Sequence, residues 1–137
     1  MNNLKKQIKI LAEKYHLQLI YAFGSRAKEI FYKVEGKKHQ VHDSKSDLDV
    51  GVKPERPLSV KEKVKIAVFF EDLFDLPKVD VVVIPEASTF LALEIVHGEL
   101  LYTHNETYEA EYQLYIMRRA AELMPYEYQK KAIILGF

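Results

Sequence analysis

The sequence predicts an α/β (α+β) fold in which helices pack on a small mixed β-sheet. Three short runs are apolar enough to be buried strands: Leu17–Phe23, Asp47–Lys53 and Val79–Ile84. The stretches between and after them carry apolar residues at helical spacing. Alternation of this kind places strands side by side with helices covering them, so we expect a layered domain.

Two helices are predicted in the first half of the chain. Leu4, Ile8, Leu11 and Tyr15 recur at helical spacing and indicate an amphipathic first helix that ends near Lys14–His16. Further along, Ser59 and Glu62 have the spacing of a capping box, which predicts a helix from that point to just before Pro77.

The C-terminal third is predicted to be mainly helical. Ser88 or Thr89 caps a helix that Gly98 stops, and Glu99–Thr103 is a short edge strand. Asn105 begins a long helix. We expect Pro125 to break it, because a proline in a helix interior removes a hydrogen bond. A final short helix over Tyr126–Leu135 would follow.

The stretch between the first two strands is the hardest to assign. Ala27–Ile30 is compatible with a short helical turn. Phe31–Val34 and His39–His42 flank Glu35–Lys38 and together suggest a hairpin.

Composition limits the classes of function. The chain has 137 residues, no cysteine and a formal net charge of zero. It is expected to be one domain, 1–137, without disulfides or thiolate zinc sites, in the cytoplasm. It contains no segment long and apolar enough to cross a membrane. Its zero net charge argues against direct nucleic-acid binding.

Two aspartates open the second predicted strand. Asp47 and Asp49 are two residues apart, so their side chains share one face, and an oxygen-binding cation such as Mg²⁺ would relieve their repulsion. Asp80 lies at the start of the third strand. A third carboxylate would allow two metal ions. Each has a plainer interpretation: a solvated edge face for the pair, and a turn or cap for Asp80.

Gly24, Ser25 and Arg26 follow the first strand. Glycine lets backbone approach a ligand closely, serine offers a hydroxyl and an N–H, and arginine suits a phosphate oxygen. Alone, Gly-Ser after a strand is most often only a turn. The combination in order is what points to a site for a phosphate chain and a metal.

These segments resemble a known family. Phe23–Ala27 (FGSRA), Ser46–Val52 (SDLDVGV) and Val79–Val83 (VDVVV) are similar to the signature of the DNA polymerase beta-type nucleotidyltransferase superfamily. Size and layout most resemble its minimal nucleotidyltransferase (MNT) branch. The resemblance covers nearly the whole chain and implies the polymerase beta-like fold.

The resemblance also implies roles for the site residues. Gly24, Ser25 and Arg26 would bind the nucleotide triphosphate, with ATP as the donor substrate. Asp47 and Asp49 would bind Mg²⁺, and Asp80 would complete the site for two ions and help deprotonate the attacking hydroxyl. The three aspartates are thus the expected catalytic and metal-binding residues.

The resemblance implies a protein partner as well. Members of the branch commonly act as the antitoxin of a HEPN-domain toxin, and some transfer AMP to a tyrosine of that toxin. We therefore expect a protein adenylyltransferase (an AMPylation enzyme) in a hetero-oligomer with a HEPN toxin. Two alternatives stay open: a non-enzymatic antitoxin that acts by occlusion, and a transferase for a small molecule such as an aminoglycoside.

One spacing departs from the family pattern. Family members have about ten residues between the serine and the first aspartate, whereas this chain has 21. The insertion, at about 28–45, costs little free energy if it lies in a surface loop.

The long helix also carries a stripe of tyrosines, Tyr108, Tyr112 and Tyr115. Core packing is the usual explanation for such a stripe, and a partner helix is the alternative.

Overall fold

A computed structural model describes residues 3–37 and 47–136 of the chain. In order, its elements are α1 (Asn3–Lys14), β1 (Leu17–Phe23), α2 (Ala27–Val34), β2 (Leu48–Pro54), α3 (Val60–Phe74), β3 (Val79–Val83), the 3₁₀ turn η1 (Ile84–Glu86), α4 (Thr89–Val96), β4 (Glu99–Thr103) and α5 (Glu106–Leu135). The four strands form one mixed sheet in the order β3-β2-β1-β4. β1 is antiparallel to both of its neighbours, and β2 is parallel to β3.

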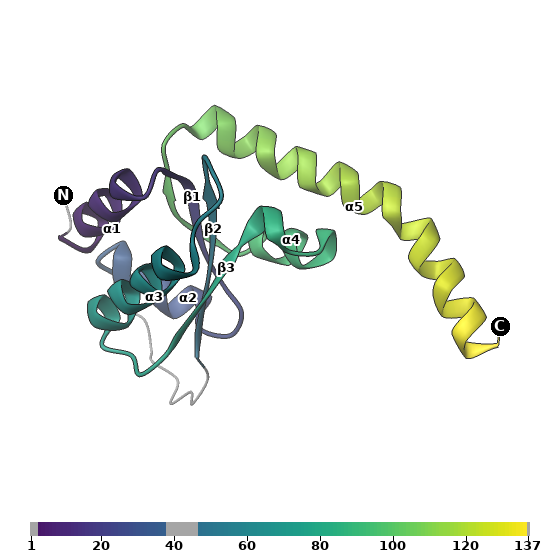
Figure 1. Cartoon of the computed structure of the whole chain (residues 1–137), viewed down its shortest axis with the longest axis horizontal. Helices are drawn as coiled ribbons and strands as arrows, with labels where there is room; N and C mark the ends of the chain where they lie inside the picture. The colour runs from purple at the N-terminus through teal and green to yellow at the C-terminus, as the bar shows by residue number, and fades with distance from the viewer. Residues whose placement is uncertain (1–2, 38–46, 137) are drawn as a thin grey trace.

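Helices cover both faces of the sheet, as Figure 1 shows. On one face, Leu48, Val50 and Val52 of β2 are fully buried against α1, α2 and α3. On the other face, Tyr21 and Phe23 of β1 pack with α4 and the first part of α5. Because side chains alternate along β2, Asp49 and Gly51 face the α4 side.

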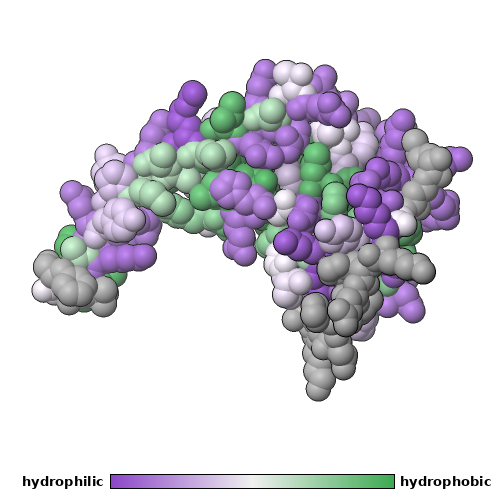
Figure 2. All heavy atoms as spheres, turned by 180° about the vertical axis from the view of Figure 1, so that it is seen from behind, coloured by the Kyte–Doolittle hydropathy of each residue, from purple (hydrophilic) through white to green (hydrophobic). Residues whose placement is uncertain are grey.

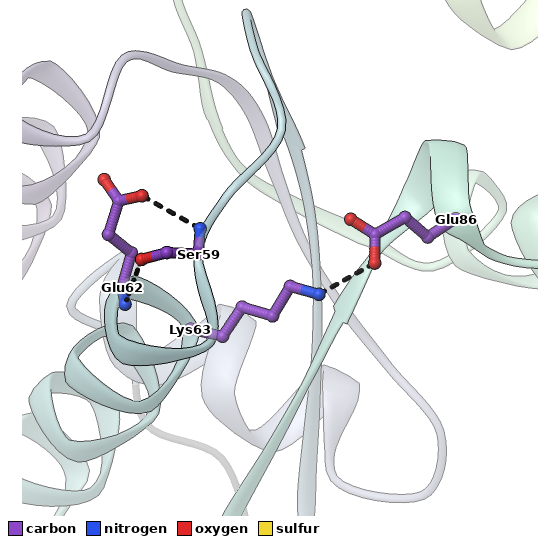
Figure 3. Close-up of polar contacts among 4 residues, drawn as sticks. All are labelled: Ser59, Glu62, Lys63 and Glu86. Atoms are coloured by element: carbon purple, nitrogen blue, oxygen red, sulfur yellow. Dashed lines mark hydrogen bonds and ion pairs between the residues drawn. The ribbon is translucent and has the colours of Figure 1, made fainter.

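The predicted capping box at the start of α3 is confirmed. The Ser59 hydroxyl accepts from the Glu62 amide at 3.1 Å, and the Glu62 carboxylate accepts from the Ser59 amide at 2.9 Å. One residue on, Lys63 donates to Glu86 of η1 at 2.8 Å (Figure 3), which ties the start of α3 to the end of β3. Ser88 caps α4 and Asn105 caps α5, also as expected.

Two sequence predictions are wrong. Phe31–Val34 is not a strand of a hairpin but the second half of α2, because Ala27, Ile30 and Val34 form one buried helical face. The other proposed strand, His39–His42, lies outside the described residues. Pro125 does not end α5, which continues as one helix to Leu135 and bends in its last third (Figure 1). Missing one backbone hydrogen bond bends a helix when the turns on both sides persist.

The first half of α5 is fixed to the sheet by buried polar contacts. The Tyr21 hydroxyl donates to Glu109 Oε1 at 2.9 Å, and Gln113 Nε2 donates to the same oxygen at 2.6 Å. Burial, followed by the hydrogen bond to Glu109, raises the pKa of Tyr21 well above its ordinary value, so the phenol stays protonated. Tyr108 and Tyr112 of the tyrosine stripe are partly buried here, while Tyr115 stays exposed. None of the helices in the described ranges is both long and apolar enough to span a bilayer.

Candidate active site

The end of β1 brings the Gly-Ser turn against the second strand. Phe23, the last residue of β1, is the register partner of Asp49. Gly24 then takes a φ of +79°, and a Cβ placed on it would lie 2.7 Å from Asp49 Oδ2. Both the backbone angle and this contact require glycine. Gly24 is therefore the point at which the turn touches the carboxylate.

The three predicted aspartates lie at one end of the sheet. Asp47 directly precedes β2, Asp49 is its second residue, and Asp80 of β3 is the register partner of Asp49. Lys78 forms ion pairs with both Asp47 and Asp80: its Nζ lies 3.7 Å from Asp47 Oδ2 and 3.7 Å from Asp80 Oδ1. The parallel pairing of β2 with β3 thus places residues 31 positions apart side by side.

Negative charge concentrates on Asp49. Burial raises the pKa of its carboxyl, and the nearby Asp80, Asp47 and Glu94 raise it further. Each of these groups disfavours a second negative charge close by. A cation at this end of the sheet would offset the repulsion, which the exposed ammonium of Lys78 does in part.

The donor chemistry of these residues suits a hard divalent cation. Carboxylate oxygens are the ligands that Mg²⁺ prefers, and Mg²⁺ commonly uses only one or two of them, with waters and substrate phosphates completing the shell. Among the residues that the structure describes, no three acidic or histidine side chains are arranged to hold one ion. The site therefore fits Mg²⁺ shared with a phosphate ligand better than a metal enclosed by protein alone.

A pocket opens beside the Gly-Ser turn. Its volume is about 710 Å³, within the usual range for small-molecule sites. It lies between the end of β1, the start of α2 and the end of α4, and is lined by Phe23, Gly24, Ser25, Ala27, Lys28, Glu29, Glu94, His97, Gly98 and Glu99. Gly24 is shared between this pocket and the contact with Asp49, so the pocket and the carboxylates adjoin.

The guanidinium of Arg26, a predicted phosphate ligand, lies beside Glu29 of α2. Its side chain is mostly buried, its Nη1 lies 3.7 Å from Glu29 Oε1, and it does not line the pocket. The basic side chain that lines the pocket is that of Lys28, the second residue of α2. The ion pair with Glu29 joins Arg26 to the first turn of α2.

Glu94 and His97 were missed by the sequence analysis. They are three residues apart near the end of α4, so they share one face of the helix and point into the pocket. The available signal was a glutamate and a histidine at that spacing in a helix that is otherwise strongly apolar, TFLALEIV. Both side chains are exposed, so they are accessible to a polar ligand in the pocket.

A mixed sheet with adjacent carboxylates on parallel strands, a Gly-Ser turn and a pocket defines a phosphoryl-transfer class of domain. Residues 5–107 match the family described as polymerase beta, nucleotidyltransferase. This match covers well over half of the chain, so the protein belongs to that family. Among curated proteins, no sequence match is significant.

Solved structures with the same fold span almost the whole chain. One, of the toxin–antitoxin MntA–HepT, is 22% identical with a TM-score of 0.67 and covers 99% of this chain and 97% of its own. A toxin–antitoxin structure with AMP-PNP is 24% identical with a TM-score of 0.66, covering 96% of both chains. A third contains the tri-AMPylated Shewanella oneidensis HEPN toxin in complex with MNT antitoxin; it is 23% identical, has a TM-score of 0.66 and covers 97% and 94%.

Proposed function

We propose that this protein is a Mg²⁺-dependent adenylyltransferase that neutralises a HEPN toxin by transferring AMP from ATP to a tyrosine of the toxin. The observation that carries the proposal is the junction at Gly24, where a nucleotide-sized pocket meets Asp49 and its register partner Asp80. The similar structures support it, because one is described with AMP-PNP and another with an AMPylated HEPN toxin.

The pocket residues would position the nucleotide. Gly24 and Ser25 present backbone close to the triphosphate, and Lys28 contributes a positive charge at the same wall. Glu94 and His97 line the opposite wall and offer hydrogen-bond partners to the nucleoside. Asp47 and Asp49 would hold Mg²⁺, which neutralises phosphate charge and orients the leaving group.

The reaction itself would be an in-line displacement. The tyrosine oxygen forms a bond to the α-phosphorus while the bond from that phosphorus to the oxygen bridging to the β-phosphate breaks, and pyrophosphate leaves. Asp80, beside Asp49, takes the proton of the attacking hydroxyl. Positioning and charge neutralisation supply most of the rate gain. We place this reaction in the cytoplasm, where ATP is supplied.

A labelling experiment tests the function. The chain is mixed with a candidate HEPN toxin, Mg²⁺ and ATP labelled at the α-phosphate, and the modified residue is found by peptide mass spectrometry. We expect AMP on a tyrosine, and no label with EDTA or with the Asp47→Asn, Asp49→Asn double variant. An unlabelled toxin in the complete reaction would contradict the proposal. Neutralisation that survives in the double variant would favour occlusion without chemistry.

A further inference from the structure

The second half of α5 stands apart from the domain. No described side chain beyond Ala120 is buried, although Met124, Tyr126, Tyr128, Ile133 and Ile134 are large and apolar or aromatic. Figure 1 shows this part of the helix extending away from the sheet. A helix of this length gains little stability in water by itself. Exposed apolar side chains on such a helix indicate a surface that a partner covers.

This helix also lies beyond the catalytic family domain. The family match ends at residue 107, and α5 begins at Glu106. The similar structures cover 96–99% of this chain, so the same overall fold in them includes a counterpart of α5. The helix is thus an addition to the nucleotidyltransferase domain, and the catalytic residues do not depend on its second half.

The exposed residues include a stripe suited to helix packing. Leu114, Met117, Ala121, Met124 and Tyr128 are spaced three, four, three and four residues apart, the repeat by which one helix packs along another. All five are exposed, with 60% of Leu114 and 66% of Tyr128 open to solvent. We name these five residues the outer stripe. Its spacing indicates that the covering element is an amphipathic helix.

The charged residues of α5 indicate which side chains border the apolar face of the partner helix. Beyond Ile116, α5 carries four basic residues, Arg118, Arg119, Lys130 and Lys131, and two acidic ones, Glu122 and Glu127. At about 100° per residue, Arg118 and Lys131 lie beside the outer stripe, one on each side, whereas Arg119 and Lys130 lie on the opposite face of the helix. A partner helix with acidic side chains beside its apolar face would complement Arg118 and Lys131.

The position of the arm suits a protein acceptor. In the view of Figure 1, α5 starts at the end of the sheet opposite the aspartates, and its C-terminal end comes back to the level at which β2 begins. Figure 2, seen from behind, shows open space between the α5 arm and the domain, with apolar side chains among those along the arm. A protein bound along the arm would therefore extend toward the level of the catalytic end.

We infer that the outer stripe of α5 is the docking surface for the protein acceptor and binds an apolar, acid-bordered helix of the HEPN toxin. The inference rests on the proposed function for the identity of the partner. It assigns binding to α5 and chemistry to residues before 107. Affinity for the toxin and affinity for the nucleotide therefore change independently.

Two tyrosines of α5 provide a matched test. Tyr128 belongs to the outer stripe and Tyr126 does not, because two residues rotate by about 200° around a helix. Their exposed fractions are nearly equal, 66% and 68%. Tyr128→Glu and Tyr126→Glu therefore make the same chemical change at equal exposure in one helix. Two dissociation constants, one for the HEPN toxin that the chain neutralises and one for AMP-PNP with Mg²⁺, are measured for both variants and the unmodified chain.

We expect Tyr128→Glu to weaken the toxin complex by about tenfold or more, since a charge enters a packed seam, and Met124→Glu to do the same. Tyr126→Glu should stay within about twofold of the unmodified chain, and AMP-PNP binding should not change in any variant. Equal toxin affinity in the Tyr128 and Tyr126 variants would overturn the inference, as would a self-associated chain that only Tyr128→Glu dissociates. A tight complex without AMP transfer would instead overturn the proposed function and leave the docking surface in place.

Discussion

Gly24 does two things that no other residue can do at its position. Its φ of +79° is unfavourable for a side chain, and a Cβ would lie 2.7 Å from Asp49 Oδ2. The second effect concerns chemistry more than stability, because the atom that must move belongs to the carboxylate that we propose holds Mg²⁺. A shift of even about 1 Å in such a group lowers rates by about 100-fold.

We therefore predict that Gly24→Ala lowers AMP transfer by about 100-fold while it costs only about 1–2 kcal/mol in unfolding free energy. Gly136→Ala is the matched control, since Gly136 has a φ of +76° but no atom within 4 Å of its Cβ position. Rates of labelling and urea unfolding curves measure the two effects. Gly24→Ala with full activity would show that Asp49 does not need its present position.

The negative charge of Asp49 lowers the stability of the folded chain. Burial and the carboxylates of Asp80, Asp47 and Glu94 all oppose its negative charge. Asp49→Asn keeps the shape of the side chain and removes that charge. In EDTA we predict that the variant melts at the same temperature as the unmodified chain or higher. Mg²⁺ should raise the melting temperature of the unmodified chain only, because it binds the folded state through the carboxylate. A variant that melts well below the unmodified chain in EDTA would contradict this.

At the scale of single elements, α3 depends on its first turn. Ser59 satisfies the Glu62 amide, which has no partner within the helix. Ser59→Ala should lower the unfolding free energy by about 1 kcal/mol and leave AMP transfer unchanged, since Ser59 lies beyond the end of β2 opposite Asp47. Ser59→Thr keeps the hydroxyl and should cost less. Chemical denaturation of the three proteins checks the order.

The same turn gives a pH-dependent contribution. The backbone hydrogen bond from Ser59 is the main cause that lowers the pKa of Glu62 below its ordinary value of 4.5. A lowered pKa in the folded state adds stability that is present above the ordinary pKa and is lost as the pH falls through the lowered one. Glu62→Gln should therefore be less stable than the unmodified chain at neutral pH, and the difference should shrink below pH 4.5. A difference that grows in acid would contradict the assignment.

The sequence predicted those elements whose signals are local. The strands β1, β2 and β3, and the caps at Ser59, Ser88 and Asn105, lie within a residue or so of their expected positions, because alternation and capping act over a few residues. The two errors, at α2 and at Pro125, arose where the same local pattern is compatible with two structures. Burial of Ile30 and Val34 against the sheet decided the first, and the persistence of helix on both sides of Pro125 decided the second.

The residues of the candidate site likewise include some with a local sequence signal and some without one. Gly24, Asp47, Asp49 and Asp80 were identifiable because each occurs in a short motif. Glu94 and His97 were not, since they reach the pocket only through the packing of α4 on the sheet. Arg26 stands in the motif, yet its side chain is turned toward Glu29. Membership of a motif therefore fixes the position of the backbone, whereas the direction of a long side chain depends on the surrounding fold.

At the scale of the whole molecule, the second half of α5 lies outside the sheet and helices that form the candidate site. Removal of residues 124–137 takes away no described side chain that is buried. We predict that the chain 1–123 folds, with an unfolding free energy within about 1 kcal/mol of the full chain, and that it binds AMP-PNP normally. Its complex with the toxin should be lost. Thermal melts and titration with nucleotide measure the first two properties, and a truncated chain that no longer binds nucleotide would contradict the division.

Two glycines set how closely α4 packs on the sheet beside the pocket at the Gly-Ser turn. A Cβ on Gly51 would lie 2.3 Å from Ile95 Cγ2, and one on Gly98 would lie 2.4 Å from the carbonyl oxygen of Ala22. Both contacts hold α4 close to the sheet, and α4 carries Glu94 and His97. A methyl group at either glycine would move that helix outward and enlarge the pocket. The choice among nucleotides that we propose for this pocket can therefore drift through the spacing of two layers, and a change at Gly51 does so without altering any residue that lines the pocket.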